Sequence, residues 1–346
     1  MKIVHAGIFR DHELGGDIVL RKGLVQNGCS VDPFDFRSVA AEHGTRKMHD
    51  LAWERISSTT DVFFIGKGNL FKPAFLHALR ERGVVTVLWY GDMRPDPEGW
   101  LLDLLPEVDF LFMTSGGSKL EEYYRRGKPS VASFFLNPSD PDLPEKYATL
   151  PRGSRDVVFT GSAYSFIGDE RKETVRYLQS RNDVSFFGGG ECACRSIGQR
   201  LAQSFRGLAG KGPVGQSSWI RGADYIAAIR SAKIGVGVSG FQNIPRYTSD
   251  RLTHYLEFGS FYLPWAFPGL ESLFDVGKEI IPFVGTEDLD RKIAHYLRNV
   301  EEREGIAAAG QRRILSEYNA KNIVGMMLDV VATGSSKRFP WVEIYK

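Results

Sequence analysis

The sequence predicts an α/β protein with two domains, each built on a doubly wound parallel sheet. Short apolar runs alternate with amphipathic stretches of about 10–15 residues along most of the 346-residue chain. The segment 137–155 interrupts this alternation, because it opens with three prolines in nine residues and continues neither a helix nor a central strand. The chain is also long for one hydrophobic core, so we expect two domains of similar size that face each other across a cleft.

The first half of the chain alternates strands with helices. Lys2–Ile8 is a compact apolar run, and the stretch after it repeats apolar residues at helical spacing from Ile18 to Leu24. Later runs rich in β-branched and aromatic residues have the length of buried strands. Strands are expected at 2–8, 31–36, 61–65, 84–89, 110–113 and 131–135, and helices at 15–27, 73–82 and 119–126.

The same alternation resumes after the proline-rich segment. Thr286 is a suitable N-cap, and the acids Glu287 and Asp288 fit the first turn of a helix. Gly207–Ser218 carries four glycines and little apolar content, so we expect a mobile loop there. Strands are expected at 156–160, 184–187, 233–238, 260–264 and 279–284, and helices at 170–180, 223–231, 249–258, 270–274 and from 286 onward, the last ending near 317.

These elements define the expected domains. The first domain spans 1–140 and the second spans 156–330. The remaining tail, 331–346, ends in Phe339-Pro-Trp-Val-Glu-Ile-Tyr345, and an aromatic end of this kind normally docks on a folded surface. We therefore expect the tail to pack back on the first domain.

The bulk composition is that of a soluble globular protein. The net charge of +2 permits an anionic ligand but does not demand nucleic acid. No apolar run approaches the roughly 18 residues of a membrane span, and the N-terminus is too strand-like for a signal peptide. The cysteines, Cys29, Cys192 and Cys194, have no disulfide-framework spacing, and no partner pair lies at zinc-site spacing. We expect a cytoplasmic protein without a metal site.

The most informative motif closes the strand expected at 84–89. An apolar, β-branched run ends there in Gly91-Asp92-Met93-Arg94-Pro95. Ligands of open α/β sheets bind outside the carboxyl ends of the strands, which is where Asp92 and Arg94 are expected. Asp92 is therefore a candidate for chemistry, although a turn former or helix cap would also be an aspartate.

A glycine-rich turn follows the first expected strand. Gly15, Gly16 and Asp17 lie where backbone N–H groups and a helix N-terminus can approach a bound group closely. The full G-x-G-x-x-G pattern is absent, so the turn does not predict a dinucleotide site of the usual kind. A plain tight turn is the alternative.

Two similar turns lie in the second half. Gly161 and Ser162 follow the first strand there, and Arg171 comes near the start of the next helix, where it suits an anion. Gly188 and Gly189 follow the next strand and allow a flat ligand to approach the backbone. A helix cap with a surface arginine and a flexible glycine loop are the respective alternatives.

The densest cluster of polar residues lies around the helix expected at 249–258. Arg246 precedes it, and Arg251, His254 and Glu257 recur at every third position of the helix, near one face. Arginine suits a diphosphate, and a glutamate can accept bonds from paired ribose hydroxyls. A solvated charged face is the alternative.

Three stretches of the second half carry a pattern known from other proteins. They are Arg251–Phe261, the run Gly269-Leu-Glu-Ser-Leu-Phe-Asp-Val-Gly-Lys-Glu279, and Glu301–Gly310. Together they resemble the C-terminal domain of GT-B glycosyltransferases of the spore-protein CgeB-like group. The resemblance implies a GT-B fold with two Rossmann-like domains and a nucleotide-sugar site on the second.

The chain is also similar in layout and length to the phage DNA β-glucosyltransferases. Gly91-Asp92-Met93-Arg94 looks like their Asp-x-Arg segment, whose aspartate is the catalytic base. Gly161 and Ser162 with Arg171 look like their diphosphate-binding segment.

The match in the sugar-nucleotide helix includes one departure. Arg251 matches the arginine of their Arg-x-x-Glu motif, but the glutamate falls on His254, and the nearest carboxylate is one turn later at Glu257. The resemblance therefore leaves the identity of the donor open.

These resemblances imply an inverting transfer from a nucleotide sugar, expected to be a UDP-sugar, with no tightly bound cofactor and no metal. Asp92 would be the base and Arg94 an acceptor contact. The leading acceptor is a hydroxylated base in double-stranded DNA, in the host cytoplasm if the protein is phage-encoded. The residues expected at the nucleotide sugar are Gly15, Gly16, Asp17, Gly161, Ser162, Arg171, Gly188, Gly189, Arg246, Arg251, His254 and Glu257.

Other functions remain open from the sequence. The acceptor of a glycosyltransferase can instead be a cell-surface, spore or small-molecule hydroxyl. A nucleotide-sugar epimerase shares the two-domain layout, and His254 would then be one of its acid–base groups. A non-catalytic nucleotide-sugar-binding protein is the third alternative.

Overall fold

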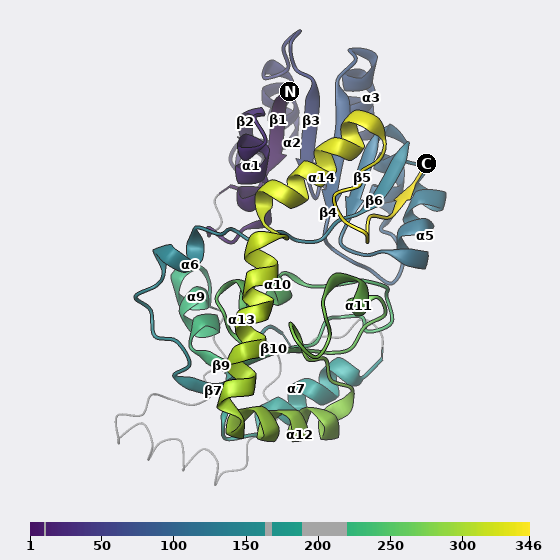
Figure 1. The fold of residues 1–346 in the computed structure, drawn as a ribbon. Helices are drawn as coiled ribbons and strands as arrows, with labels where there is room; N and C mark the ends of the chain where they lie inside the picture. Colours follow the sequence, from purple (N-terminus) through teal and green to yellow (C-terminus); the bar gives the residue numbers. More distant parts are fainter. Residues whose placement is uncertain (10–11, 163–167, 189–219) are drawn as a thin grey trace. The chain divides into compact units, whose positions relative to one another are not determined.

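The chain folds as two units (Figure 1). The first comprises Met1–Asp140, Ile244–Thr248 and Leu315–Lys346, and the second comprises Pro141–Asn243 and Ser249–Ile314. The computed structural model describes residues 1–9, 12–162, 168–188 and 220–346. Gly189, Cys192, Cys194 and the loop expected at 207–218 lie outside these described residues.

The first unit is built on a seven-stranded sheet with the order β11-β6-β5-β4-β3-β1-β2. All neighbouring strands are parallel except β11, which runs antiparallel to β6. Six of the strands lie within two residues of the ranges expected from the sequence; β11 was not expected as a strand. The strands are β1 (Lys2–Gly7), β2 (Ser30–Asp35), β3 (Val62–Gly66), β4 (Val85–Tyr90), β5 (Phe110–Met113), β6 (Val131–Phe134) and β11 (Ile344–Tyr345).

Helices of the first unit include three that the sequence patterns did not predict: α2, α4 and α14. In α2, Gly44 has a non-helical backbone that interrupts the periodicity. Helix α14 packs on α1, where Gly23 makes close approach possible, because a Cβ at this position would lie 2.4 Å from the carbonyl oxygen of Ala320. The helices are α1 (Gly16–Gln26), α2 (Phe36–Glu54), α3 (Pro73–Glu81), α4 (Gly99–Leu104), the 3₁₀ turn η1 (Leu105–Glu107), α5 (Gly117–Gly127) and α14 (Ala320–Thr333).

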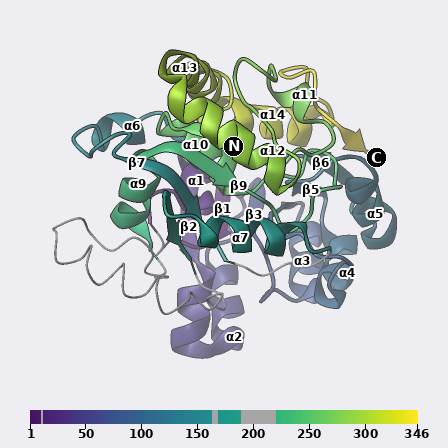
Figure 2. The ribbon, with the colours of Figure 1, turned by 90° about the horizontal axis from the view of Figure 1, so that it is seen from below.

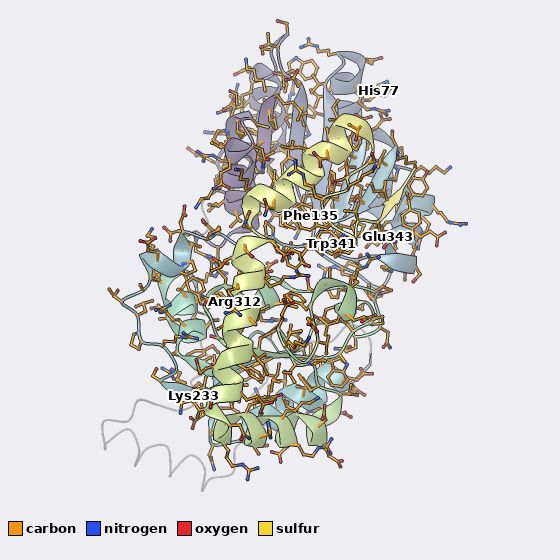
Figure 3. The ribbon with its side chains drawn as sticks, viewed as in Figure 1. His77, Phe135, Lys233, Arg312, Trp341 and Glu343 are labelled. Atoms are coloured by element: carbon orange, nitrogen blue, oxygen red, sulfur yellow. The ribbon has the colours of Figure 1, made fainter. Side chains whose placement is uncertain are left out.

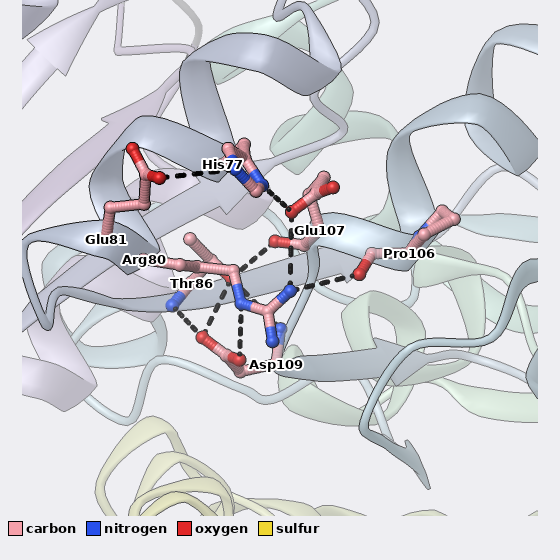
Figure 4. Close-up of polar contacts among 7 residues, drawn as sticks. All are labelled: His77, Arg80, Glu81, Thr86, Pro106, Glu107 and Asp109. Carbon is pink, nitrogen blue, oxygen red and sulfur yellow. Dashed lines mark hydrogen bonds and ion pairs between the residues drawn. The ribbon is translucent and has the colours of Figure 1, made fainter.

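A polar network fixes the amino-terminal edge of this sheet (Figure 4). Arg80 of α3 contacts Glu107 at 3.3 Å and Asp109 at 3.0 Å, and His77 contacts Glu107 at 3.1 Å. The hydroxyl of Thr86 donates to the carbonyl of Glu107 at 2.8 Å, and its backbone N–H donates to Asp109 at 2.9 Å. These contacts join α3 to the starts of β4 and β5.

The second unit is built on a four-stranded parallel sheet with the order β10-β9-β7-β8. Helices α7 and α12 lie side by side (Figures 1 and 2). The elements are α6 (Leu143–Lys146), β7 (Arg155–Thr160), α7 (Glu170–Ser180), β8 (Val184–Phe187), α9 (Gly222–Arg230), β9 (Ala232–Gly237), α10 (Asp250–Glu257), β10 (Phe261–Pro264), α11 (Leu270–Leu273), α12 (Gly285–Arg298) and α13 (Val300–Ser316).

The sheet of the second unit separates two layers of side chains. Val157, Phe159, Ile234 and Val236 form one core with apolar residues of α7, α12 and α13. The residue between the last two, Gly235, instead faces α10 on the other side of the sheet. Together the two parallel sheets with their helices confirm the predicted α/β class.

The structure differs from the sequence expectation at 279–284. No strand forms there; this segment takes part only in isolated bridges, Trp265 with Phe283 and Val276 with Ile280. Pro282 lies within the run and has no N–H to donate to a ladder, which explains the difference.

The division into units also differs from the expected domain boundaries. The chain returns to the first unit at Leu315, within α13, rather than after residue 330. The short segment Ile244–Thr248 also belongs to the first unit. In the tail, β11 pairs with β6 of the first unit's sheet. Among the described residues, none of the helices combines the length and apolar character needed to cross a membrane.

Each sheet has one position at which the strand order reverses. It lies between β1 and β3 in the first unit and between β7 and β9 in the second. In doubly wound sheets the crevice at the carboxyl end of such a pair is the usual ligand site. The residues that follow β1, β3, β7 and β9 therefore lie where a ligand is expected.

Candidate functional site

Arg171 joins the two loops at the switch point of the second unit. Its Nε and Nη2 atoms donate to the carbonyl of Ser162 at 3.2 and 2.8 Å, and Nη1 donates to the carbonyl of Val238. The residue is 2% exposed. Through these bonds to backbone carbonyls, Arg171 holds the loop after β7 against the loop after β9.

Arg251, in the first turn of α10, lies against the turn after β7. A Cβ at Gly161 would be 2.5 Å from its Nη1 atom, so glycine at 161 leaves room for the guanidinium in this position. The Nη2 atom donates to the carbonyl of Val238 at 3.3 Å. The Nε atom has no hydrogen-bond partner among the described residues. A half-buried guanidinium therefore lies beside a glycine turn, with one buried N–H that has no partner in the described part of the chain.

Gly188 completes this turn. A Cβ at Gly188 would lie 1.6 Å from the carbonyl oxygen of Gly161, and the Gly161 N–H donates to the carbonyl of Phe187 at 2.8 Å. The structure therefore brings together five residues that the sequence singled out. They are Gly161, Ser162, Arg171, Gly188 and Arg251.

His254 and Glu257 occupy the same helix as Arg251 but are buried. The histidine is 9% exposed, and its Nδ1 atom lies 3.1 Å from the hydroxyl of Tyr225. Glu257 is 1% exposed. The spacing that suggested a ligand-facing helix side therefore puts two of its three polar residues into the protein interior.

Two buried tyrosines beside Arg251 were not predicted. Tyr255 of α10 stacks on Tyr262 of β10, with ring centroids 5.2 Å apart. Burial raises the pKa of Tyr262 to about 12 although Arg251 acts in the opposite direction, so the phenol stays protonated at neutral pH. The sequence signal was Gly235 and Gly237 in β9, because a Cβ at either would collide with one of these rings.

The switch point of the first unit is closed by Asp17. Its carboxylate lies 3.1 Å from Nε2 of His5 and accepts the N–H of Ile8 at 2.8 Å. A Cβ at Gly7 or Gly66 would lie less than 3 Å from this carboxylate group. Asp17 therefore points inward between the ends of β1 and β3.

The glycine turn that precedes Asp17 packs against Trp89 of β4. Gly15 is the N-cap of α1, and a Cβ at Gly16 would lie 2.4 Å from the ring of Trp89. Packing against this ring is sufficient reason for a glycine at 16.

Asp92 and Arg94 lie on the segment that follows β4. The carboxylate of Asp92 forms an ion pair with Lys67, and both side chains are partly exposed. Arg94 lies 3.9 Å from Glu98, which also accepts the hydroxyl of Tyr90 at 2.9 Å. Lys67 was not predicted, although a Gly-Lys-Gly sequence directly after a buried strand was a signal for it.

Arg246 has partners within the first unit. It forms an ion pair with Glu343, donates to the carbonyl of Trp341 at 2.7 Å and lies 4.9 Å from the ring centroid of Phe134. Trp341 and Glu343 lie in the C-terminal segment and are labelled in Figure 3. Burial lowers the pKa of its guanidinium. Gly161, Arg171 and Arg251, with which it was grouped, belong to the second unit.

A known family matches the part of the chain that contains Arg171 and α10. Residues 171–329 match the model of a family described as glycosyl transferase-like. The match covers less than half of the chain and shows that this segment is similar to a glycosyltransferase domain. It contains Arg171, Arg251 and the tyrosines around α10. No curated protein matches the sequence.

Solved structures similar to the whole chain include glycosyltransferases of low sequence identity. HepE from Anabaena in complex with UDP-glucose is 11% identical, with a TM-score of 0.61 over 96% of this chain and 100% of that one. Sucrose-phosphate synthase from Thermosynechococcus elongatus is 14% identical, with a TM-score of 0.62 over 96% and 98%. AviGT4, a glycosyltransferase involved in avilamycin A biosynthesis, is 11% identical, with a TM-score of 0.61 over all of both chains. These likenesses confirm the predicted GT-B fold with Rossmann-like units.

Proposed function

We propose that this protein transfers a sugar from a nucleotide-sugar donor, a UDP-sugar, to an acceptor hydroxyl. The observation that carries the proposal is the Arg251 guanidinium beside the Gly161 turn, at the switch point of a glycosyltransferase domain. The UDP-glucose bound to the structurally similar HepE supports the choice of donor.

The donor diphosphate would lie at the turn after β7. The partly exposed guanidinium of Arg251 would offer N–H donors to phosphate oxygens. Arg171 keeps the loops after β7 and β9 in place, and Gly188, after β8, lets its own segment approach the turn at Gly161. When the sugar leaves, negative charge grows on the diphosphate, and a preorganised guanidinium stabilises it. His254 and Glu257 are both buried, so they would support the donor site from the protein interior.

Asp92 would act as the general base on the acceptor side. Its carboxylate takes the proton of the acceptor hydroxyl while the hydroxyl oxygen bonds to the anomeric carbon and the bond from that carbon to the diphosphate breaks. One displacement inverts the anomeric configuration. Arg94, partly exposed two residues later, would contact the acceptor.

The acceptor we propose to test first is a hydroxymethylated base in double-stranded DNA. The resemblance of Gly91-Asp92-Met93-Arg94 to the Asp-x-Arg segment of phage DNA β-glucosyltransferases supports this choice. A base inside a duplex must leave the stack before its hydroxyl can react. The net charge of +2 is compatible with DNA but gives little general attraction to it.

The experiment measures sugar transfer from UDP-sugars to hydroxymethylated DNA, unmodified DNA and a panel of small hydroxyl acceptors. We expect Asp92→Asn to lower kcat about 10²- to 10⁴-fold, because the amide cannot take the proton, and to leave donor affinity unchanged. Asp96→Asn is the matched control, since Asp96 lies on the same segment with its side chain 86% exposed. Transfer by Asp92→Asn at the wild-type rate would contradict the assignment of the base.

A further inference from the structure

Lys67 and Asp92 meet at the carboxyl edge of the first unit's sheet. Strands β3 and β4 are neighbours whose register pairs Gly66 with Trp89, so the residues that follow the two strands emerge side by side. The Lys67 ammonium contacts Oδ2 of Asp92, with 35% of the lysine side chain and 41% of the aspartate side chain exposed. The pair is thus both formed and open to a substrate.

The backbone that presents Lys67 is in an unfavourable conformation. Its φ is 68°, in the left-handed region that favours glycine. The Lys67 N–H donates to the carbonyl of Trp89 at 2.9 Å, and the Gly68 N–H donates to that of Gly66 at 2.9 Å. A tight turn therefore fixes the lysine above the end of β4, in a place where glycine would be easier to accommodate.

Stability alone does not account for a lysine at this position. A left-handed conformation costs a non-glycine residue more than a half-exposed ion pair usually returns. Strained residues that persist are concentrated at functional sites, so the conformation of Lys67 suggests a role in the chemistry of its partner.

Asp92 needs such a partner. Residues 91–95 form neither helix nor strand, and the buried side chain of Met93 anchors the segment one residue further on. Regular structure therefore does not set the direction of the carboxylate, whereas the contact with Lys67 does.

We propose that Lys67 is the positioning residue of Asp92, an inference that rests on the proposed function. The ammonium holds Oδ2, so we assign Oδ1 to the acceptor hydroxyl. The O–H bond of the acceptor breaks, its proton goes to Oδ1, and the lysine keeps its own protons throughout. Lys67 therefore acts through Asp92 and does not touch the reacting atoms.

A first experiment tests the pair without an activity assay. A carbodiimide activates a carboxylate, and an amine in contact displaces the urea to form an amide bond. We expect mass spectrometry of the treated full-length protein to find a peptide that links Lys67 to Asp92. The link should be absent from Lys67→Arg and from Asp92→Asn. Its absence from the wild type would overturn the inference.

A second experiment tests the role of the pair in transfer. We expect Lys67→Met to lower kcat about 10- to 100-fold with an unchanged donor KM, because misplacing a catalytic group by about 1 Å has an effect of this size. Lys67→Arg keeps the cation and should restore most of the rate. Lys128→Met is the matched control: Lys128 is also left-handed, with φ 56°, but follows α5 at the other edge of the sheet.

The results separate the inference from the function on which it rests. If the wild type cross-links and transfers sugar but Lys67→Met has the wild-type kcat, the pair is only structural and the inference is overturned. If the wild type cross-links but transfers sugar to no acceptor, the proposed function is wrong. The positioning role proposed for Lys67 is then wrong as well. Thermal melting of Lys67→Met near the wild-type temperature rules out loss of folding as the cause of a low rate.

Discussion

Arg251 and Gly161 depend on each other at the turn after β7. The guanidinium occupies the space that a Cβ at 161 would need, and Arg171 holds the surrounding loops through carbonyls of Ser162 and Val238. A cation in this place can bind a diphosphate only if its remaining N–H groups stay free. In the described part of the chain, the Nε atom of Arg251 is buried and has no hydrogen-bond partner.

This arrangement predicts the effect of removing the charge. Arg251→Met should raise the donor Kd about 10- to 100-fold, since a hydrogen bond to a charged group contributes roughly 1.5–3 kcal/mol. Calorimetric titration with a UDP-sugar measures it. Arg298→Met, an exposed arginine in the last turn of α12, serves as the control. An unchanged Kd for Arg251→Met would place the diphosphate elsewhere.

Sequence reasoning identified candidate residues better than it identified their directions. Gly161 and Arg251 were predictable because glycine turns after strands and arginines at helix starts are local patterns. The inward orientation of Asp17 was not, since it depends on His5 and on glycines in two other strands. Lys67 is recognisable only once β3 and β4 are known to be neighbours.

The C-terminal segment is an element whose role depends on long-range contacts. Strand β11 adds to the edge of the first unit's sheet, and Glu343 just before it accepts the N–H of Gly117 at 2.9 Å and pairs with Arg246. Both side chains of this pair are less than 20% exposed. Removing one partner would leave the other charge partly buried without compensation.

The pair therefore predicts a non-additive pattern in stability. Glu343→Gln should lower the free energy of unfolding by about 3 kcal/mol, because it leaves the Arg246 guanidinium without its counter-charge. The double variant Arg246→Met, Glu343→Gln should regain at least half of that loss. Glu121→Gln, in the more exposed pair with Arg125 on α5, should cost no more than about 0.5 kcal/mol. Urea unfolding measures all three, and additive losses would contradict the prediction.

Elements were predictable wherever their own sequence carried the signal. Strands such as β5 and helices such as α7 follow from apolar runs and helical spacing, and their observed bounds equal the expected ones. The apolar run at 279–284 predicted a strand, but none forms there. The local feature that opposes a strand is Pro282, which has no N–H to donate. Strand β11 has only two residues and forms because β6 offers a free edge, which no local pattern reveals.

At the scale of the whole molecule, both units have a sheet with one reversal of strand order, but the residues at the two reversals differ. Asp17 packs between the ends of β1 and β3, whereas the end of β7 carries a glycine turn with an arginine beside it. Nucleotide binding is therefore expected at the second unit, and the first is left with Asp92 and Lys67 at its edge for the acceptor. The division of the chain into units was only partly predictable, because Ile244–Thr248 and α14 join the first unit through tertiary contacts.

The central claim, that the second unit binds a nucleotide sugar, is tested most directly by thermal unfolding of the wild type with UDP-sugars. A donor at about 100 times its Kd stabilises the folded state by roughly 2.7 kcal/mol, so we predict a rise in the Tm of several degrees. The rise should be much smaller in Arg251→Met at the same donor concentration. An unchanged Tm of the wild type with every nucleotide sugar at high excess would contradict the account.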